Sequence, residues 1–111
     1  MVASAEIRDL ILDMVEKLVR EYAPERVILF GSYAHGTPRE GSDIDLFIVK
    51  ETTDRYIDRC VAVRRILTDP NRLVGLDTIV LTPQEVSERL RVGDQFVAEI
   101  LEKGELLYGP R

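Results

Sequence analysis

The chain has 111 residues, of which 45% are hydrophobic and 32% charged, and this composition excludes a disordered chain and suits a single globular domain over residues 1–111. Its formal net charge of -5 makes nucleic acid an unlikely main partner, because neutralisation of phosphates by basic side chains supplies most of the affinity for DNA or RNA. No apolar run approaches the length of a membrane span, and the single cysteine, Cys60, fits a reducing, cytoplasmic environment.

The first part of the chain predicts a helix, a strand and a short helix in succession. Apolar residues spaced by three and four along residues 7–22 predict an amphipathic helix that ends before Pro24. The β-branched run of residues 26–30 predicts a buried strand. Residues 32–37 then predict a brief helical turn, which ends at the following proline.

The middle of the chain predicts two strands around a second amphipathic helix. We expect strands at residues 42–50 and 73–81, where β-branched and apolar residues predominate. Between them, residues 53–67 predict a helix. The residues expected on its inward face are Ile57, Val61, Ile66 and Leu67.

The end of the chain predicts two helices. Thr82 followed by Pro83 is a common way for a helix to begin, Gly93 interrupts the region, and Gly104 is placed as a C-terminal cap. The apolar face expected on the last helix consists of Phe96, Val97, Ile100 and Leu101. The predicted order, α-β-α-β-α-β-α-α, favours an α/β (α+β) fold in which helices flank a small mixed central sheet.

Asp43 and Asp45 are the first candidates for chemistry. Residues two apart on a strand point to the same face, so these carboxylates should lie side by side and repel each other. A divalent cation with a preference for hard oxygen ligands, such as Mg²⁺, would relieve this repulsion. Taken alone, the pair is better explained as solvated charges at a strand edge.

Gly31 and Ser32 form the second candidate, because they follow a strand and open a short helix. Free backbone N–H groups at such a point form an anion site, and the Ser32 hydroxyl adds a donor. The alternative is a tight turn at Gly31 with Ser32 as a helix cap.

Asp77 is the third candidate, because it interrupts an otherwise apolar strand. A buried aspartate is costly unless it is paired or binds a metal, although an outward-facing position on a half-solvated strand is an alternative. Three carboxylates beside a phosphate cradle together favour a functional site over the separate structural explanations.

The stretch Gly31-Ser32-Tyr33-Ala34-His35-Gly36, followed by Ser42-Asp43-Ile44-Asp45-Leu46, resembles the signature of the DNA polymerase beta-like nucleotidyltransferase superfamily. The resemblance is closest to its small prokaryotic members, the minimal nucleotidyltransferases, and extends over nearly the whole chain. It implies an enzyme that transfers a nucleoside monophosphate by attack of a hydroxyl at the α-phosphorus of ATP.

The resemblance also assigns roles to single residues. It implies that Asp43 and Asp45 bridge two Mg²⁺ ions, with Asp77 as the third ligand. Gly31 and Ser32 would hold the β- and γ-phosphates, and Ser42 would join the nucleotide-binding residues. His35 departs from the pattern, because an arginine is frequent there and a histidine supplies no fixed positive charge at neutral pH.

The resemblance further implies a protein partner. The chain ends soon after the catalytic layer, so we expect a partner, or self-association into a homo-oligomer, to complete the acceptor site. Minimal nucleotidyltransferases commonly act as antitoxins, which here implies transfer of AMP to a tyrosine of a HEPN-type toxin. Two alternatives are a non-catalytic antitoxin that binds and masks its partner, and nucleotidyl transfer to a small molecule such as an aminoglycoside.

Overall fold

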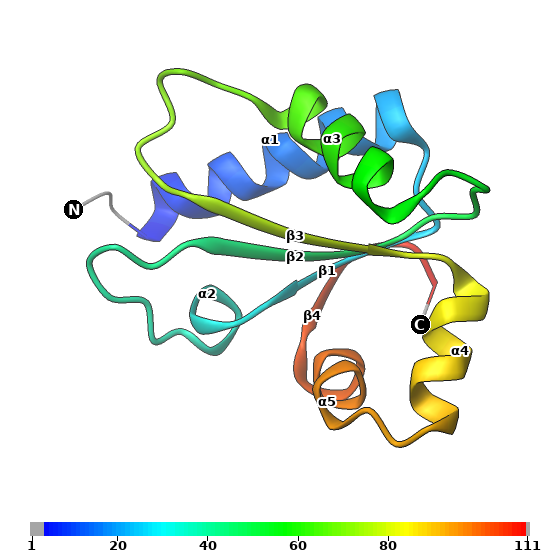
Figure 1. Ribbon diagram of the computed structural model, residues 1–111. Coiled ribbons are helices and arrows are strands. Elements are labelled where there is room, and N and C mark those ends of the chain that lie inside the picture. Colours follow the sequence, from blue (N-terminus) through cyan, green and yellow to red (C-terminus); the bar gives the residue numbers. More distant parts are fainter. Residues whose placement is uncertain (1–3, 111) are drawn as a thin grey trace.

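The computed structural model describes residues 4–110, in which helices pack on both faces of a single four-stranded sheet (Figure 1). The elements in chain order are α1 (Ser4–Tyr22), β1 (Arg26–Phe30), α2 (Ser32–His35), β2 (Ile44–Val49), α3 (Tyr56–Leu67), β3 (Leu76–Leu81), α4 (Pro83–Arg91), α5 (Gln95–Lys103) and β4 (Glu105–Tyr108). Within the described residues, none of these helices is both long enough and apolar enough to cross a lipid bilayer.

The sheet is mixed and has the strand order β3-β2-β1-β4. Strand β1 is antiparallel to both β2 and β4, whereas β2 and β3 are parallel. The predicted mixed sheet flanked by helices is therefore confirmed. The register places Asp45 of β2 between Phe30 of β1 and Asp77 of β3.

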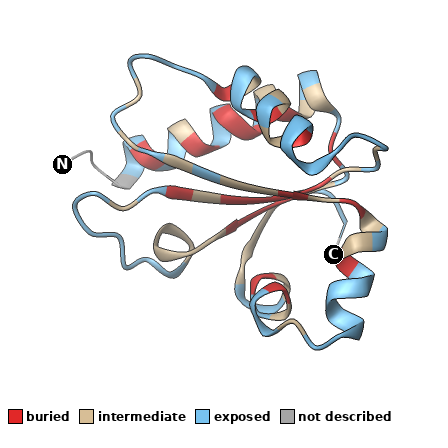
Figure 2. Ribbon diagram, viewed as in Figure 1, coloured by how far each residue is buried: buried red, intermediate tan, exposed pale blue. Residues whose placement is uncertain are grey.

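Each face of the sheet supports its own apolar cluster. Helices α1 and α3 cover one face, and α4 and α5 cover the other (Figure 1). Ile44, Leu46 and Ile48 of β2 belong to the first cluster, and Phe47 and Val49 belong to the second. Strand β2 is therefore covered on both sides over most of its length, as its burial shows (Figure 2).

Several local predictions are confirmed. Strand β1 has the predicted bounds, and helix α4 begins after Thr82 with a capping box in which Thr82 and Glu85 bond each other's backbone N–H. The strands predicted at 42–50 and 73–81 are shorter than expected, since β2 begins at Ile44 and β3 at Leu76. Asp43 therefore lies just before β2 rather than within it.

The predicted element order was wrong at its end, because it omits β4. This strand has four residues and forms an edge of the sheet by pairing with β1 alone, with a shift in register between Val27 and Ile28. Such a short edge strand has little local signal. Its pairing depends on β1, which lies more than 70 residues earlier in the chain. The corrected order is α-β-α-β-α-β-α-α-β.

The predicted inward face of α3 was also wrong in part. The side chains of Ile57 and Val61 are 61% and 39% exposed, whereas Arg59 is only 6% exposed. The inward face runs through Arg59, Val63 and Leu67, which are spaced by four residues. The sequence did not predict this inward face, because one of its residues is an arginine and arginine side chains usually lie in solvent.

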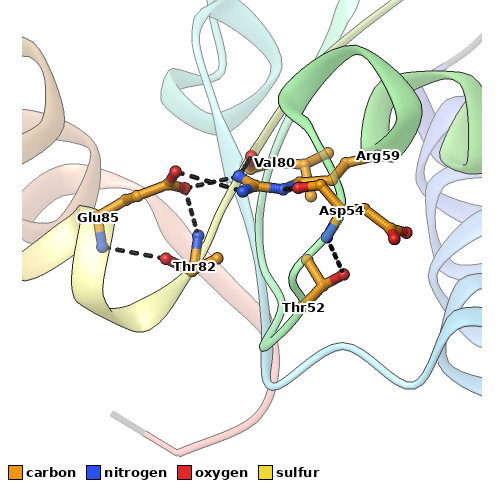
Figure 3. Close-up of polar contacts among 6 residues, drawn as sticks. All are labelled: Thr52, Asp54, Arg59, Val80, Thr82 and Glu85. Carbon is orange, nitrogen blue, oxygen red and sulfur yellow. Dashed lines mark hydrogen bonds and ion pairs between the residues drawn. The ribbon is translucent and has the colours of Figure 1, made fainter.

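Arg59 joins three elements at the end of the sheet away from the aspartates (Figure 3). Its guanidinium donates to Glu85 of α4 at 2.6 Å, to the Val80 carbonyl of β3 at 3.3 Å and to the Asp54 carbonyl at 2.9 Å. Glu85 also accepts from the Thr82 backbone N–H at 2.8 Å. The buried charge is therefore paired and hydrogen-bonded, as a stable buried charge must be.

Helix α5 differs from expectation at one apolar position. Val97 and Ile100 are buried and Leu101 packs against the same cluster, but Phe96 is 56% exposed. Its ring meets Phe30 edge-on, with 5.8 Å between ring centroids. Phe96 therefore forms part of the surface beside the end of β1.

Candidate active site

Asp45 and Asp77 are register partners on the parallel strands β2 and β3. Asp45 alternates with Ile44 and Leu46, which face α1 and α3, so its side chain lies on the sheet face that carries α4 and α5. Asp43 immediately precedes β2 and lies two residues before Asp45. Asp45 is half-buried, and the other two aspartates are exposed. The sheet thus brings the three predicted carboxylates to one end of the parallel strands β2 and β3.

Two glycines make room for these carboxylates. A Cβ atom built on Gly31 would lie 2.2 Å from Oδ2 of Asp45, and one built on Gly75 would lie 2.1 Å from Oδ1 of Asp43. Both distances are far inside van der Waals contact, so any side chain at either glycine would displace the carboxylate. The sequence pattern identified Gly31 but gave Gly75 no role, although a glycine inside a strand pattern often marks such a close approach.

The charge of the site is not balanced by nearby cations. Burial, followed by the charges of Asp77 and Asp43, raises the pKa of Asp45 from its ordinary value of 3.8 to about 6. Over residues 4–110, no side-chain hydrogen bond or ion pair involves any of the three aspartates. The site therefore holds unpaired negative charge.

This donor set fits a hard divalent cation such as Mg²⁺. Carboxylate oxygens are hard ligands, and those of Asp43, Asp45 and Asp77 are not engaged by other side chains in the described part of the chain. The carboxylates do not form a closed cage, since no three His, Cys, Asp or Glu side chains in the described part of the chain converge as a metal-binding group. Asp43 lies against Gly75 and Asp45 lies against Gly31.

The turn from β1 into α2 has the form of a phosphate cradle. Gly31 occupies the N-cap position with a φ of 76°, a left-handed value that favours glycine, and no side chain caps the helix. Its carbonyl accepts from the N–H groups of Ala34 at 3.1 Å and His35 at 3.2 Å. The earlier amides, those of Ser32 and Tyr33, precede these bonds and have no helical partner. Ser32 is not the helix cap, so its hydroxyl is not committed to that role.

Ser42 has a structural part in the loop before Asp43. Its hydroxyl accepts from the Arg39 backbone N–H at 2.8 Å, and its own N–H donates to the Arg39 carbonyl at 2.9 Å. Its carbonyl accepts a long bond of 3.4 Å from the Tyr33 hydroxyl of α2. Ser42 thereby ties the loop to α2 and orients the residue that follows it. Direct contact with a nucleotide stays a prediction.

Two pockets open beside this arrangement. One of about 190 Å³ lies between α2 and α5 and is lined by Gly31, His35, Phe96 and Lys103, among others. A second, of about 480 Å³, is lined by Tyr33, Ser42 and Gly75 among others. His35 itself is exposed. The phosphate cradle and the aspartates therefore lie between two hollows of the surface.

The chain belongs to the family described as "Polymerase beta, Nucleotidyltransferase", which it matches over residues 13–110. The chain is thus a nucleotidyltransferase domain, as the Gly31-Ser32 and Asp43-x-Asp45 motifs predicted.

Two relatives come from Methanocaldococcus jannaschii. "Putative protein adenylyltransferase MJ0604" is 34% identical over 88 residues, which cover 76% of this chain and 78% of the relative. "Putative protein adenylyltransferase MJ1305" is 39% identical over 64 residues, which cover 55% of this chain and 44% of the relative. The match therefore spans less than half the length of the second relative.

Solved structures show the same fold. A nucleotidyltransferase from Sulfolobus solfataricus, described as putative, superposes with a TM-score of 0.63 at 26% identity, covering 98% of this chain and 90% of that one. A structure described as "the toxin-antitoxin with AMP-PNP" superposes with a TM-score of 0.61 at 23% identity, covering 90% of this chain and 74% of that one. The second likeness establishes the fold alone.

Proposed function

We propose that this chain transfers AMP from ATP to a tyrosine hydroxyl of a partner protein, a HEPN-type toxin, and thereby acts as its antitoxin. The observation that carries the proposal is the placement of Asp45 opposite Asp77 and against Gly31, with Asp43 beside them. That arrangement joins three unpaired carboxylates to a turn with free backbone N–H groups, which are the parts that nucleotidyl transfer requires.

The reaction follows from charge and position. The tyrosine hydroxyl gives up its proton to water, and its oxygen attacks the α-phosphorus to form a new P–O bond. The bond between the α-phosphorus and the oxygen that bridges to the β-phosphate breaks, and its electron pair leaves with pyrophosphate. Asp43 and Asp45 would hold Mg²⁺, with Asp77 as a further ligand on the acceptor side. Two such ions, when bound, would favour loss of the proton from the attacking hydroxyl and offset the charge on the departing pyrophosphate.

The protein residues position the reactants. Gly31 and the amides of Ser32 and Tyr33 would bind the β- and γ-phosphates, so that the α-phosphorus lies over Asp45. Gly75 leaves the carboxylate of Asp43 the position that a side chain there would occupy. The Ser42 turn orients Asp43 through the backbone.

The comparisons support a protein acceptor and an adenine nucleotide. Both archaeal relatives carry protein adenylyltransferase in their names, and one structural neighbour is a toxin-antitoxin complex with AMP-PNP. The formal net charge of -5 also suits a protein partner better than a nucleic acid.

Intact-mass spectrometry tests this proposal. The chain is incubated with ATP, Mg²⁺ and the protein encoded beside it, and the mass of that neighbour is measured before and after. We expect the neighbour to gain the mass of AMP on a tyrosine. Asp43→Ala should abolish the gain while the protein remains folded.

Two results would contradict the proposal. An unmodified neighbour that still co-purifies with the chain would indicate the alternative function, an antitoxin that masks its partner by binding. A neighbour modified equally well by Asp43→Ala would show that the aspartates are not the reacting centre.

A further inference from the structure

The pocket between α2 and α5 lies on the side of the Gly31 turn that faces away from Asp45 and Asp77. The strand order β3-β2-β1-β4 puts Asp77 on the first strand, Asp45 on the second and Gly31 at the end of the third. Neighbouring strands are about 4.8 Å apart, so these groups form a line across the sheet. The pocket of about 190 Å³ continues this line, because it is lined by Gly31, by Lys103 at the end of α5 and by Gly104, which precedes β4.

A triphosphate in the proposed orientation follows the same line. With its α-phosphorus near Asp45 and Asp77 and its later phosphates on Gly31, the terminal phosphate points away from the aspartates and toward this pocket. Besides backbone dipoles and the Ser32 hydroxyl, the cradle supplies no fixed positive charge, because α2 contains neither lysine nor arginine. The terminal phosphate therefore needs a cation from elsewhere in the chain.

Lys103 is the side chain placed to supply that cation. It lines the pocket together with Gly31 and His35, and its ammonium is a compact charge with three donors. Its nearest acidic neighbour is Glu99, one helical turn earlier, at 3.6 Å from carboxylate oxygen to Nζ. Both side chains of this pair are 60% exposed, so the contact is weak and the ammonium can turn to another anion.

We propose that Lys103 binds the terminal phosphate of the nucleotide and the pyrophosphate that leaves, and that it supplies the fixed positive charge that the cradle lacks. Glu99 opposes this role, because its carboxylate competes for the same ammonium. The inference deepens the proposed function and rests on it, since it assumes a triphosphate on Gly31.

Binding measurements with the full chain test this inference without any acceptor. Isothermal titration gives the Kd for three probes in the presence of Mg²⁺: ATP, inorganic tripolyphosphate and AMP. We expect Lys103→Ala to raise the Kd for ATP and tripolyphosphate by roughly tenfold at low salt and to leave the Kd for AMP unchanged. Lys103→Arg should bind nearly as well as the wild type.

Helix α4 offers a matched control pair. Arg91 and Glu88 form an exposed ion pair of the same kind, at 2.5 Å, and neither lines the pocket. Glu99→Gln should lower the Kd for tripolyphosphate, because it frees Lys103. Arg91→Ala and Glu88→Gln change the net charge of the protein by the same amounts and should leave every Kd within about twofold.

The outcomes separate the inference from the function on which it rests. If the wild type binds ATP and Lys103→Ala binds both ATP and tripolyphosphate equally well, the role of Lys103 is wrong and the proposed function stands. If Lys103→Ala and Arg91→Ala weaken binding equally, the effect is general electrostatics and the inference is also wrong. If the wild type binds neither ATP nor tripolyphosphate, the proposed function fails and the inference fails with it.

Discussion

Asp45 is the aspartate whose environment departs most from that of a solvated carboxylate. It is half-buried on β2, opposite Asp77 and against Gly31, and its pKa is raised to about 6 by burial first and then by the two neighbouring aspartates. A folded-state pKa above the unfolded value means that the folded protein binds this proton more tightly. The group therefore favours folding below its unfolded pKa, and that contribution is lost as pH rises through about 6.

Asp45→Asn should stabilise the protein at alkaline pH when divalent cations are absent. At about pH 8 we expect a gain of roughly 1 kcal/mol in the free energy of unfolding, allowing for solvent screening of a half-exposed carboxylate. At about pH 4 the gain should vanish, because the native carboxyl is already protonated. Thermal melts in EDTA at both pH values measure this. Asp13→Asn, on the exposed surface of α1, is the control and should change little at either pH. An equal effect of Asp45→Asn at both pH values would contradict the prediction.

Gly75→Ala should separate activity from stability. The new Cβ would press on the exposed, movable carboxylate of Asp43, so we expect transfer to fall by about a hundredfold with little change in melting temperature. Gly93→Ala is the converse control, because Gly93 has a φ of 80° and open space around it, far along the chain from the aspartates. It should cost about 1 kcal/mol of stability and leave transfer intact. Melting curves and transfer rates of both variants test this prediction, and equal losses of transfer in the two variants would contradict it.

At the scale of single elements, the structure shows which sequence signals act locally. Strand β1 and the start of α4 were predictable, because a β-branched run and a Thr-Pro pair define them within a few residues. Strand β4 was not, because its four residues become a strand only through pairing with β1. The inward face of α3 was misread for a related reason, since Arg59 is buried by a partner on α4. Both the formation of β4 and the burial of Arg59 therefore depend on contacts with residues distant in the sequence.

Arg59 should stabilise the fold by holding α3, β3 and α4 together. Arg59→Ala leaves Glu85 without its ion pair and the Val80 carbonyl without a donor, so we expect a loss of about 2–3 kcal/mol in the free energy of unfolding. Urea denaturation measures it. Arg65→Ala, which removes an exposed arginine from the same helix, should stay within about 0.5 kcal/mol. Equal losses in the two variants would show that the buried contacts of Arg59 contribute nothing specific.

At the scale of the whole molecule, the fold brings together at one end of the sheet the aspartates and glycines that lie far apart in the sequence. The residue pattern singled out the Asp43 and Asp45 pair, the Gly31 turn and Asp77, and the family resemblance added the roles expected of them. The contact of Gly75 with Asp43 and the pocket that brings Lys103 to Gly31 were not predictable, because both depend on how strands and helices pack.

Mg²⁺ and ATP together should stabilise the wild-type protein, because a ligand that binds only the folded state shifts the unfolding equilibrium. At a hundredfold excess over Kd the gain is about 2.7 kcal/mol. A thermal shift assay measures the effect, and either removal of Mg²⁺ or the substitution Asp45→Ala should eliminate it. An undiminished shift without Mg²⁺ would exclude the assigned role of the carboxylates.

Transfer of a nucleotidyl group by this protein is tested most directly with ATP that carries a label on one chosen phosphate. The chain, Mg²⁺ and the neighbouring protein are incubated in parallel with ATP labelled at the α-phosphate and with ATP labelled at the γ-phosphate. We predict that only the α-label becomes covalently attached to the neighbour, and that Asp43→Ala attaches neither. Attachment of the γ-label would indicate phosphoryl transfer, and attachment of neither label by the wild type would contradict catalysis altogether.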